Sequence, residues 1–333
     1  MYKLIDNDRL CIFKNTVLSI FNGREPQEIG LLNGGSPSKT YRFLIEDKIY
    51  VARLMDLEEL AISRQNQVQC LQAAAQLDVA PKCYYADAEA GIVIMEYIEN
   101  KSIDVTKEWL CEVADLLRKL HTYNNFPPPH QPLFSYINGL VKSLRALPLN
   151  SLLIDYFKNF DEIVSILSPH LIMSPCHNDL NCKNVLFNGK TYFIDWEAAG
   201  MEDPFFDVAT ICNEFIFNEP QEHYFLQQYF GREPNLKEQA KILLMKQVSY
   251  CYLAIHYLQH AVNGGLTLVD EKIMDKMPTA REWSLGYKSG KYQQINPDDF
   301  LLYALVQIKE SLAQMATKQF NEAKAVLKPP TFF

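Results

Sequence analysis

The sequence predicts an α+β fold with two lobes: a β-rich N-terminal lobe with one long helix, and a mostly helical C-terminal lobe. Stretches with strand-like apolar patterns gather before residue 98 and are separated by short turn-forming segments. After residue 98, apolar residues recur mainly at helical spacing. The 333 residues are enough for two such parts, which we place at residues 1–97 and 98–333.

The N-terminal lobe is expected to hold strands around one long helix. Residues 57–77 are predicted to form this helix, because they lack Gly and Pro and stop just before Ala80-Pro81. A further helix is expected within residues 1–28. The predicted strands are residues 29–32, 40–45, 49–55, 82–88 and 91–97.

Two features of this lobe suggest phosphate binding. The Gly-Gly-Ser segment at residues 34–39 lies between two predicted strands, where loop N–H groups could approach phosphates. Arg53 shares a strand face with Ile49 and Val51, and a cation on an apolar face needs an anionic partner. Each feature has a simpler alternative, because Gly-Gly is common in turns and an Arg on an edge strand can reach solvent.

The C-terminal lobe is predicted to be built from helices. They are expected at residues 108–121, 137–147, 152–167, 208–217, 222–229, 236–262 and 300–327. His121 closes the apolar side of the first of these helices. We interpret it as a core histidine with a satisfied ring nitrogen rather than as a catalytic group.

The segment from residue 176 to residue 207 contains the side chains best suited to catalysis. Asp179 follows His177 by two residues, and Asn184 lies five residues further on. Asp195 comes after a short turn and an apolar run. The simplest alternative is a polar loop beside a β-ribbon.

A hairpin within this segment is expected to bring Asn184 and Asp195 together. The Asn-Gly pair at residues 188–189 predicts a two-residue turn, because both central positions favour a positive φ. This turn places Asn184 opposite Phe193, with Asp195 as its diagonal neighbour at roughly 7–8 Å. Two oxygen-bearing side chains at this spacing could share Mg²⁺. Asp179, on the loop that enters the hairpin, would remain available to a substrate hydroxyl.

Composition limits the classes of partner. A net charge of −8 argues against nucleic acid binding, which requires clustered Lys and Arg, and suits a cationic substrate. The eight cysteines contain no C-x-x-C pair, which favours free thiols in a reducing, cytoplasmic setting. The charged N-terminal residues do not resemble a signal peptide, and no apolar run is long enough to span a membrane.

The chain resembles the choline/ethanolamine kinase family within the aminoglycoside phosphotransferase superfamily, which has a protein-kinase-like bilobal fold. The most specific match is Ile-Asp-Trp-Glu-Ala-Ala-Gly-Met-Glu-Asp-Pro at residues 194–204, followed by Phe-Asp-Val-Ala at residues 206–209. The glycine-rich segment, the basic strand residue, Ala80-Pro81, and the Leu-x-x-Leu-His sequence ending at His121 also match.

The resemblance implies an ATP- and Mg²⁺-dependent phosphotransferase that acts on the hydroxyl of a small molecule. It implies Asp179 as the catalytic base, with Asn184 and Asp195 as catalytic and Mg²⁺-binding residues. The implied nucleotide-binding residues are Gly35, Ser36, Ser38, Lys39 and Arg53 at the phosphates, and Glu96 to Ile98, through their backbone, at adenine.

The resemblance also suggests choline as the substrate. Glu214 corresponds to an acidic residue close to the substrate's ammonium group in choline kinases. Tyr252 and His256 lie four residues apart on one helical face and could form part of a cation–π cage. The alternatives are an exposed helix carboxylate or a partner of the helix N-terminus for Glu214, and plain core packing for the aromatic pair.

Two departures from the family leave other functions open. Gln67 occupies the helix position where a Glu is expected to pair with Arg53, so Arg53 would have a neutral partner unless Glu58 or Glu59 substitutes. The late helix lacks the tryptophans of the choline kinase cage. Ethanolamine, thiamine and aminoglycosides therefore remain candidate substrates, and a catalytically silent nucleotide-binding protein is a further alternative. The sequence does not predict the oligomeric state.

Overall fold

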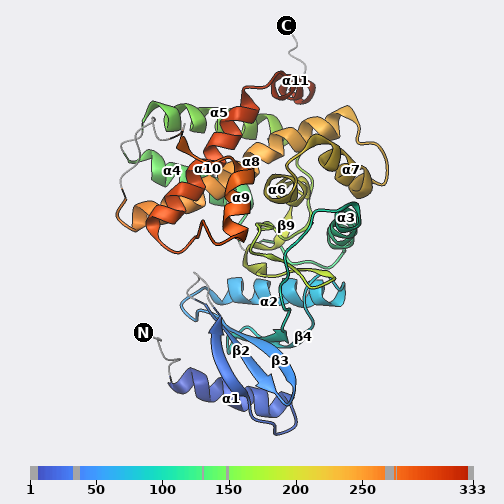
Figure 1. Cartoon of the computed structure of the whole chain (residues 1–333), viewed down its shortest axis with the longest axis vertical. Helices are drawn as coiled ribbons and strands as arrows, with labels where there is room; N and C mark the ends of the chain where they lie inside the picture. Colours follow the sequence, from blue (N-terminus) through green and yellow to red (C-terminus); the bar gives the residue numbers. More distant parts are fainter. Residues whose placement is uncertain are drawn as a thin grey trace. The chain divides into compact units, whose positions relative to one another are not determined.

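The computed structural model describes residues 7–32, 38–129, 131–147, 150–266, 274 and 276–328. The chain forms two compact units (Figure 1). Unit 1 comprises Met1–Lys101, Asn124–His130 and Asn184–Gly200. Unit 2 comprises Ser102–Tyr123, Gln131–Lys183 and Met201–Phe333. The predicted lobes, 1–97 and 98–333, remain a prediction, and unit 1 also takes in two segments from later in the chain.

Unit 1 is built on an antiparallel sheet in the order β1-β2-β3-β5-β4. Its strands are β1 (Gln27–Leu32), β2 (Lys39–Ile45), β3 (Lys48–Leu54), β4 (Cys83–Asp87) and β5 (Ile92–Glu96). Alternate residues of β2 and β3 are buried, and they pack on α1 (Asn7–Ile20), where Phe13 contacts Phe43 edge-on at 5.3 Å. Arg53 has the opposite parity in β3, so it belongs to the face turned away from α1.

Helix α2 (Ala61–Gln76) begins four residues later than predicted. The reason is local, because the Asp56 side chain accepts a hydrogen bond from the Glu58 N–H at 3.0 Å and turns the chain before the helix starts. Polar side chains on α2 are buried but satisfied. Asn66, for example, donates to the Pro128 carbonyl at 3.0 Å, which joins the segment Asn124–His130 to unit 1.

The predicted hairpin exists, but its register is shifted by one residue. Strands β7 (Val185–Phe187) and β8 (Thr191–Phe193) pair Phe187 with Thr191 and Val185 with Phe193. The loop therefore contains three residues, 188–190, rather than two. The predicted pairing of Asn184 with Phe193 is wrong. Instead, the Ile194 N–H donates to the Asn184 carbonyl at 2.9 Å.

Unit 2 is helical apart from the strand β6 (Ser174–Cys176) and the last two residues of its partner β9 (Gly200–Glu202). Helices α3 (Lys107–His121) and α5 (Ser151–Leu167) confirm two predicted helices, and each begins one residue before its predicted start. The remaining elements are α4 (Leu133–Arg145), η1 (Ser168–His170), α6 (Phe205–Phe215), α7 (Glu219–Phe230), α8 (Leu236–Asn263), α9 (Ala280–Lys288), α10 (Pro297–Met315) and α11 (Lys318–Leu327).

Helix α8 is the centre of unit 2 (Figure 1). It is buried on several sides and packs against α4, α5, α6, α10 and α11. Asn235 and Glu238 form a capping box that fixes its first turn. In the described part of the chain, no helix is long and apolar enough to cross a membrane.

Two features at the C-terminal end differ from the prediction. The helix expected over residues 300–327 is divided, because Thr317 accepts a hydrogen bond from the Phe320 N–H at 3.2 Å and starts α11 as a new helix. Helix α9 was not predicted. Its start is fixed by a capping box between Thr279 and Glu282.

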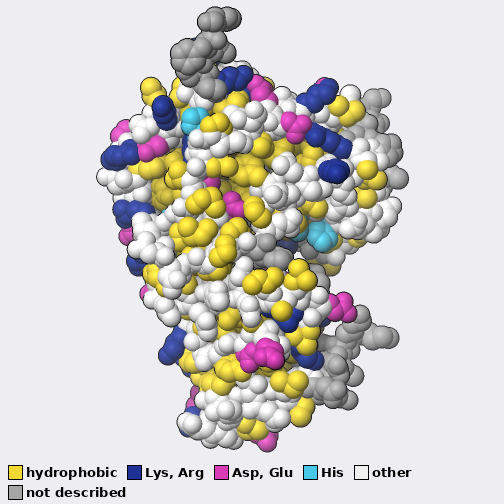
Figure 2. Space-filling view, turned by 180° about the vertical axis from the view of Figure 1, so that it is seen from behind, with side chains coloured by type: hydrophobic (Ala, Val, Ile, Leu, Met, Phe, Trp, Pro, Cys, Tyr) yellow, Lys and Arg dark blue, Asp and Glu magenta, His cyan; other side chains and the backbone are white. Residues whose placement is uncertain are grey.

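Charged side chains are dispersed over one face of the molecule (Figure 2). On the face shown in Figure 2, Lys and Arg side chains are scattered among acidic and apolar ones rather than gathered in one stripe. A dispersed pattern of this kind differs from the basic surfaces that track a phosphate backbone.

Replacing Gly200 by Ala is expected to destabilise the protein. A Cβ at this position would lie 2.5 Å from the Cα and 2.8 Å from the N of Pro129, so the backbone of the 124–130 segment would have to move. We expect Gly200→Ala to lower the free energy of unfolding by about 1–3 kcal/mol in a urea titration. Gly139→Ala is the control, since a Cβ there meets no atom within 4 Å and Ala favours the helix. Equal stability of the two variants would contradict the steric argument.

Candidate active site

The loop that carries Asp179 is held by the buried carboxylate of Asp207, in the first turn of α6. One oxygen of Asp207 accepts the His177 N–H at 2.7 Å, and the other accepts the Asn178 N–H at 2.8 Å. Asn178 has a φ of 64°, a left-handed conformation in which two successive N–H groups can converge on one carboxylate. Hydrogen bonds to a charged group are about twice as strong as neutral ones, so Asp207 fixes the start of the loop.

His121 supports the same carboxylate. Its Nε2 lies 3.2 Å from Asp207 Oδ2, and its Nδ1 lies 2.8 Å from the Tyr229 hydroxyl. The prediction of a core histidine with a satisfied nitrogen is confirmed, because the residue is 8% exposed and both nitrogens have partners.

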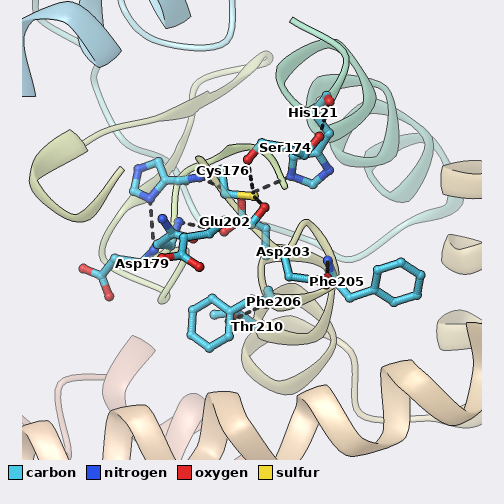
Figure 3. Close-up of polar contacts among 12 residues, drawn as sticks. His121, Ser174, Cys176, Asp179, Glu202, Asp203, Phe205, Phe206 and Thr210 are labelled. Carbon is cyan, nitrogen blue, oxygen red and sulfur yellow. Dashed lines mark hydrogen bonds and ion pairs between the residues drawn. The ribbon is translucent and has the colours of Figure 1, made fainter. Parts of the chain in front are cut away.

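Asp179 is the accessible carboxylate of this loop. Its neighbours His177, Asn178 and Leu180 are buried, whereas Asp179 is half-buried. The Asn181 amide donates to Asp179 Oδ1 at 3.0 Å and orients it. Figure 3 shows the Asp179 side chain extending away from the residues around His121. An oriented, solvent-accessible carboxylate is suited to accept a proton from a hydroxyl.

Asn184 directly precedes β7, and Asp195 follows β8 by two residues. Both therefore lie at the open end of the hairpin, in unit 1. The bond from the Ile194 N–H to the Asn184 carbonyl holds this end together. Asp195 adopts a left-handed conformation, with a φ of 66°, which breaks the strand alternation and redirects its side chain. Carboxylate and amide oxygens at one hairpin end have the chemistry that Mg²⁺ prefers.

Arg53 is bound by two carboxylates from the same segment. Its guanidinium donates to Asp195, and to Glu197 at 2.8 Å. Burial by itself lowers the pKa of Arg53, but the charges of Asp195 and Glu197 outweigh it and raise the pKa above the ordinary value. The solvent alternative for Arg53 is therefore wrong, since the side chain is 14% exposed.

Glu197 was not predicted as a site residue. The repulsion from Asp195 and, to a lesser extent, burial raise the pKa of Glu197, although its side chain is 45% exposed and solvent screens this repulsion. The sequence did contain a signal for Glu197. Asp195 and Glu197 form an Asp-x-Glu pair at the end of a strand, and such a pair is as typical of a cation-binding site as of an ordinary loop.

The neutral Gln67 is not the partner of Arg53. The Gln67 amide donates to Glu59 Oε1 at 2.6 Å, and the Ser63 hydroxyl binds the same oxygen. The expected neutral partner for Arg53 is therefore replaced by carboxylates from the hairpin, and Gln67 instead holds Glu59 in place.

The remaining nucleotide residues are partly described. Gly35 and Ser36 lie outside the described residues. The Ser38 hydroxyl accepts the Asp56 N–H at 3.2 Å, and Lys39 is exposed at the start of β2. At the end of β5, the Glu96 N–H is bonded to the Lys82 carbonyl at 2.9 Å, and Ile98 is buried. Their contact with a nucleotide remains a prediction.

Glu214 is a buried residue of α6 that joins three parts of unit 2. Its two oxygens accept the Cys182 N–H at 3.1 Å and the Tyr303 hydroxyl at 2.9 Å. The alternative of an exposed helix carboxylate is wrong, because Glu214 is 7% exposed. Burial raises the pKa of Glu214, and these hydrogen bonds oppose the increase.

Tyr252 and His256 lie together on α8, as their spacing predicted, within a packed aromatic group. Tyr252 contacts Phe206 edge-on at 5.7 Å, and His256 Nδ1 lies 3.0 Å from the Tyr136 hydroxyl. Burial, with smaller effects of His260 and Lys183, lowers the pKa of His256 to about 4. His256 is therefore neutral at pH 7, and its role in substrate binding remains a prediction.

A second aromatic group lies next to Glu214. This aromatic cluster consists of Tyr257, Tyr303, Trp283 and Tyr287. Tyr303 is its centre, with ring centroids 4.7 Å from Tyr257 and 4.3 Å from Trp283, and Trp283 stacks on Tyr287 at 5.0 Å. The sequence shows these aromatics, but their convergence depends on α9, which the sequence did not predict.

A cavity of about 840 Å³ lies elsewhere in unit 2. Its lining includes Asn213, Glu222 and Lys246, and residues of α8, α10 and α11, but none of residues 177–184. This cavity is therefore not the site formed around Asp179.

Comparisons with known proteins identify the family. Residues 28–240, more than half of the chain, match the model of the phosphotransferase enzyme family. The chain belongs to this family.

Individual proteins are similar to this chain at low identity. Protein LicA of Haemophilus influenzae is 25% identical over 213 residues, covering 59% of this chain and 61% of LicA. Human ethanolamine kinase 2 is 27% identical over 244 residues, covering 64% of this chain and 62% of the kinase. The chain thus spans about three fifths of the length of these relatives.

A solved structure confirms the predicted fold of this chain. A choline/ethanolamine kinase family protein from Mesorhizobium loti has a TM-score of 0.69 and 21% identity, covering 96% of this chain and 99% of that protein. The α+β, kinase-like fold inferred from the resemblance is therefore correct.

Removing the charge of Asp207 is expected to destabilise the loop that carries Asp179. In Asp207→Asn, one acceptor oxygen becomes an amide group that cannot accept a backbone N–H, so a buried charge-assisted bond is lost. We expect the free energy of unfolding to fall by about 2–3 kcal/mol in a urea titration. Asp155→Asn, which removes an exposed pair with Lys158, should change it by less than about 0.5 kcal/mol. A similar small effect for both variants would refute the anchoring role.

His256 is expected to make stability depend on pH. Its pKa is lowered from 6.5 to about 4 in the folded protein, so the unfolded chain binds more protons between these values. The contribution of His256 to the free energy of unfolding therefore keeps its full value above pH 6.5, where His256 is neutral in both states, and it decreases as pH falls toward 4. We expect His256→Gln to reduce the loss of stability between pH 7 and pH 4.5 by about 2 kcal/mol. An equal loss of stability in His256→Gln and in the parent protein over this pH range would contradict the role of His256.

Proposed function

We propose that this phosphotransferase transfers the γ-phosphoryl group of ATP to the hydroxyl of a small cationic alcohol, most simply choline. The observation that carries this proposal is the link between the aromatic cluster and the predicted catalytic loop. Glu214 accepts hydrogen bonds from Cys182, three residues after Asp179, and from Tyr303, at the centre of the cluster. An aromatic surface fixed to a loop with a catalytic carboxylate is suited to hold an alcohol by its ammonium group.

Asp179 is the proposed base. Its carboxylate accepts a hydrogen bond from the alcohol hydroxyl and takes the proton as the oxygen forms a bond to the γ-phosphorus. The bond from this phosphorus to the bridging oxygen breaks, and ADP leaves with the electron pair. Asn181 and Asp207 act earlier, by orienting the carboxylate and fixing the loop.

Unit 1 supplies groups that fit a metal-bound nucleotide. The Nε–H of Arg53 is buried without a hydrogen-bond partner among the described residues, so it can donate to a phosphate oxygen. Asn184 and Asp195 would hold Mg²⁺, and the same segment adds the carboxylate of Glu197. Bound Mg²⁺ would neutralise charge on the phosphates. The phosphate-contacting roles of Gly35, Ser36, Ser38 and Lys39 and the adenine-contacting role of Glu96 and Ile98 belong to this proposal.

The similar proteins support an amino alcohol over the other substrates. One relative is named an ethanolamine kinase, and the solved structure is named a choline/ethanolamine kinase family protein. Aminoglycosides carry several cations and would require more carboxylates than Asp179 and the buried Glu214 provide. A catalytically silent protein is less favoured, because Arg53 has carboxylate partners in spite of Gln67.

A panel of alcohols tests the proposal. Purified protein with Mg²⁺-ATP is mixed in turn with choline, ethanolamine, thiamine or kanamycin, and ADP release is measured in a coupled assay. We expect the largest kcat/KM for choline, followed by ethanolamine, and background rates for kanamycin. ATP binding without ADP release from any alcohol would overturn the proposed activity and favour the silent protein.

Asp179→Asn is the matched catalytic variant of this assay. The amide keeps the size of the side chain but cannot take a proton, so we expect kcat to fall by about 10²–10⁴-fold. The affinity for ATP, measured by calorimetry, should stay within about twofold of the parent protein. Asp161→Asn, an exposed change in the same unit, should retain full activity. Full turnover in Asp179→Asn would exclude this residue as the base.

A further inference from the structure

Lys183 brings a cation of the protein itself to the aromatic cluster. Its Nζ lies 5.6 Å from the centroid of the Tyr257 ring and 3.5 Å from the Tyr257 hydroxyl. This distance is within the range of a cation–π interaction. The ring is fixed in turn, because the Tyr257 hydroxyl donates to Gln294 at 3.2 Å and the ring packs edge-on against Tyr303 at 4.7 Å.

The position of Lys183 is adjacent to the predicted chemistry. It follows Asp179 by four residues and Cys182, the partner of Glu214, by one. Lys183 is half-buried. Its ammonium group is thus a partly dehydrated cation beside the Tyr257 ring.

The same surroundings would stabilise an ammonium group of a substrate. The favourable features are a π system and a partly dehydrated position, and both are already used by Lys183. Two ammonium groups at one ring would repel each other, and the repulsion is strong where no water separates them. A neutral alcohol of the same shape would not experience this repulsion.

We propose that Lys183 determines specificity by competing with the ammonium group of the alcohol for the face of Tyr257. This inference rests on the proposed function, because it assumes that the aromatic cluster binds the alcohol. Lys183 then weakens the binding of cationic alcohols but not of neutral ones. It thereby reduces the difference in affinity between the two classes of alcohol. Specificity by repulsion is a known way to tune a difference of affinities.

The decisive comparison uses choline and its neutral isostere 3,3-dimethyl-1-butanol, in which carbon replaces nitrogen. Lys183→Met removes the charge and keeps an unbranched apolar side chain. We expect the KM and Kd of choline to fall by about 3- to 30-fold in Lys183→Met, the size of one cation–π interaction. Values for the neutral isostere should change by less than twofold.

Two further variants separate competition from other roles. Lys183→Arg keeps the charge and should leave choline weakly bound. In a Tyr257→Leu background the contested ring is missing, so adding Lys183→Met should no longer improve choline binding. A fall in kcat at constant choline KM in Lys183→Met would instead indicate a role toward the phosphoryl group and would overturn the competition.

Binding measured without ATP separates this inference from the proposed function. Calorimetry with choline and with tetramethylammonium, which cannot be phosphorylated, reports the cation site alone. Tighter binding of both in Lys183→Met supports the inference even if the parent protein shows no turnover. Unchanged or weaker binding in this variant, or no binding to either protein, overturns it.

Discussion

The buried carboxylate of Asp207 is the constraint on which the rest of unit 2 depends. It accepts two successive backbone N–H groups of the loop before Asp179 and is supported by His121. A carboxylate without exposed surface is stable only when its lone pairs are used, so the loop and α6 have to keep one arrangement. Glu214, seven residues further along α6, binds the same loop at its other end. Two acidic residues of one helix thus fix both ends of the segment that carries the proposed base.

In unit 1, the main electrostatic feature is the balance of charge around Arg53. Arg53 lies on the sheet face turned away from the apolar core, and its charge is balanced by Asp195 and Glu197 from the hairpin segment. Three charges of mixed sign in a small space leave an excess of negative charge, which is suited to a divalent cation and its polyphosphate ligand. The helix residue Gln67 adds no charge there and instead fixes Glu59.

Much of this could be predicted from the sequence, because the strong signals are local. The strands, the long helix and the loop around Asp179 follow from periodicity and turn-forming residues. The hairpin register was wrong because Asn-Gly usually forms a two-residue turn, whereas here Lys190 joins the loop and Gly189 has a φ of 113°. The pairing of Arg53 with Glu197 spans 144 residues, and no local pattern encodes such a contact. The aromatic cluster was missed for the same reason, since it requires side chains from three helices.

The conformation of Asp195 has a consequence for how this chain can vary. The backbone at this position is left-handed, which Gly, Asn and Asp tolerate and other residues adopt with strain. The proposed metal chemistry requires an oxygen donor at the same position. Glu would satisfy the chemistry but not the backbone, and Gly would satisfy the backbone but not the chemistry. The backbone requirement and the requirement for an oxygen donor together leave Asp and Asn as the residues that can occupy this site. Either requirement alone would allow more residue types.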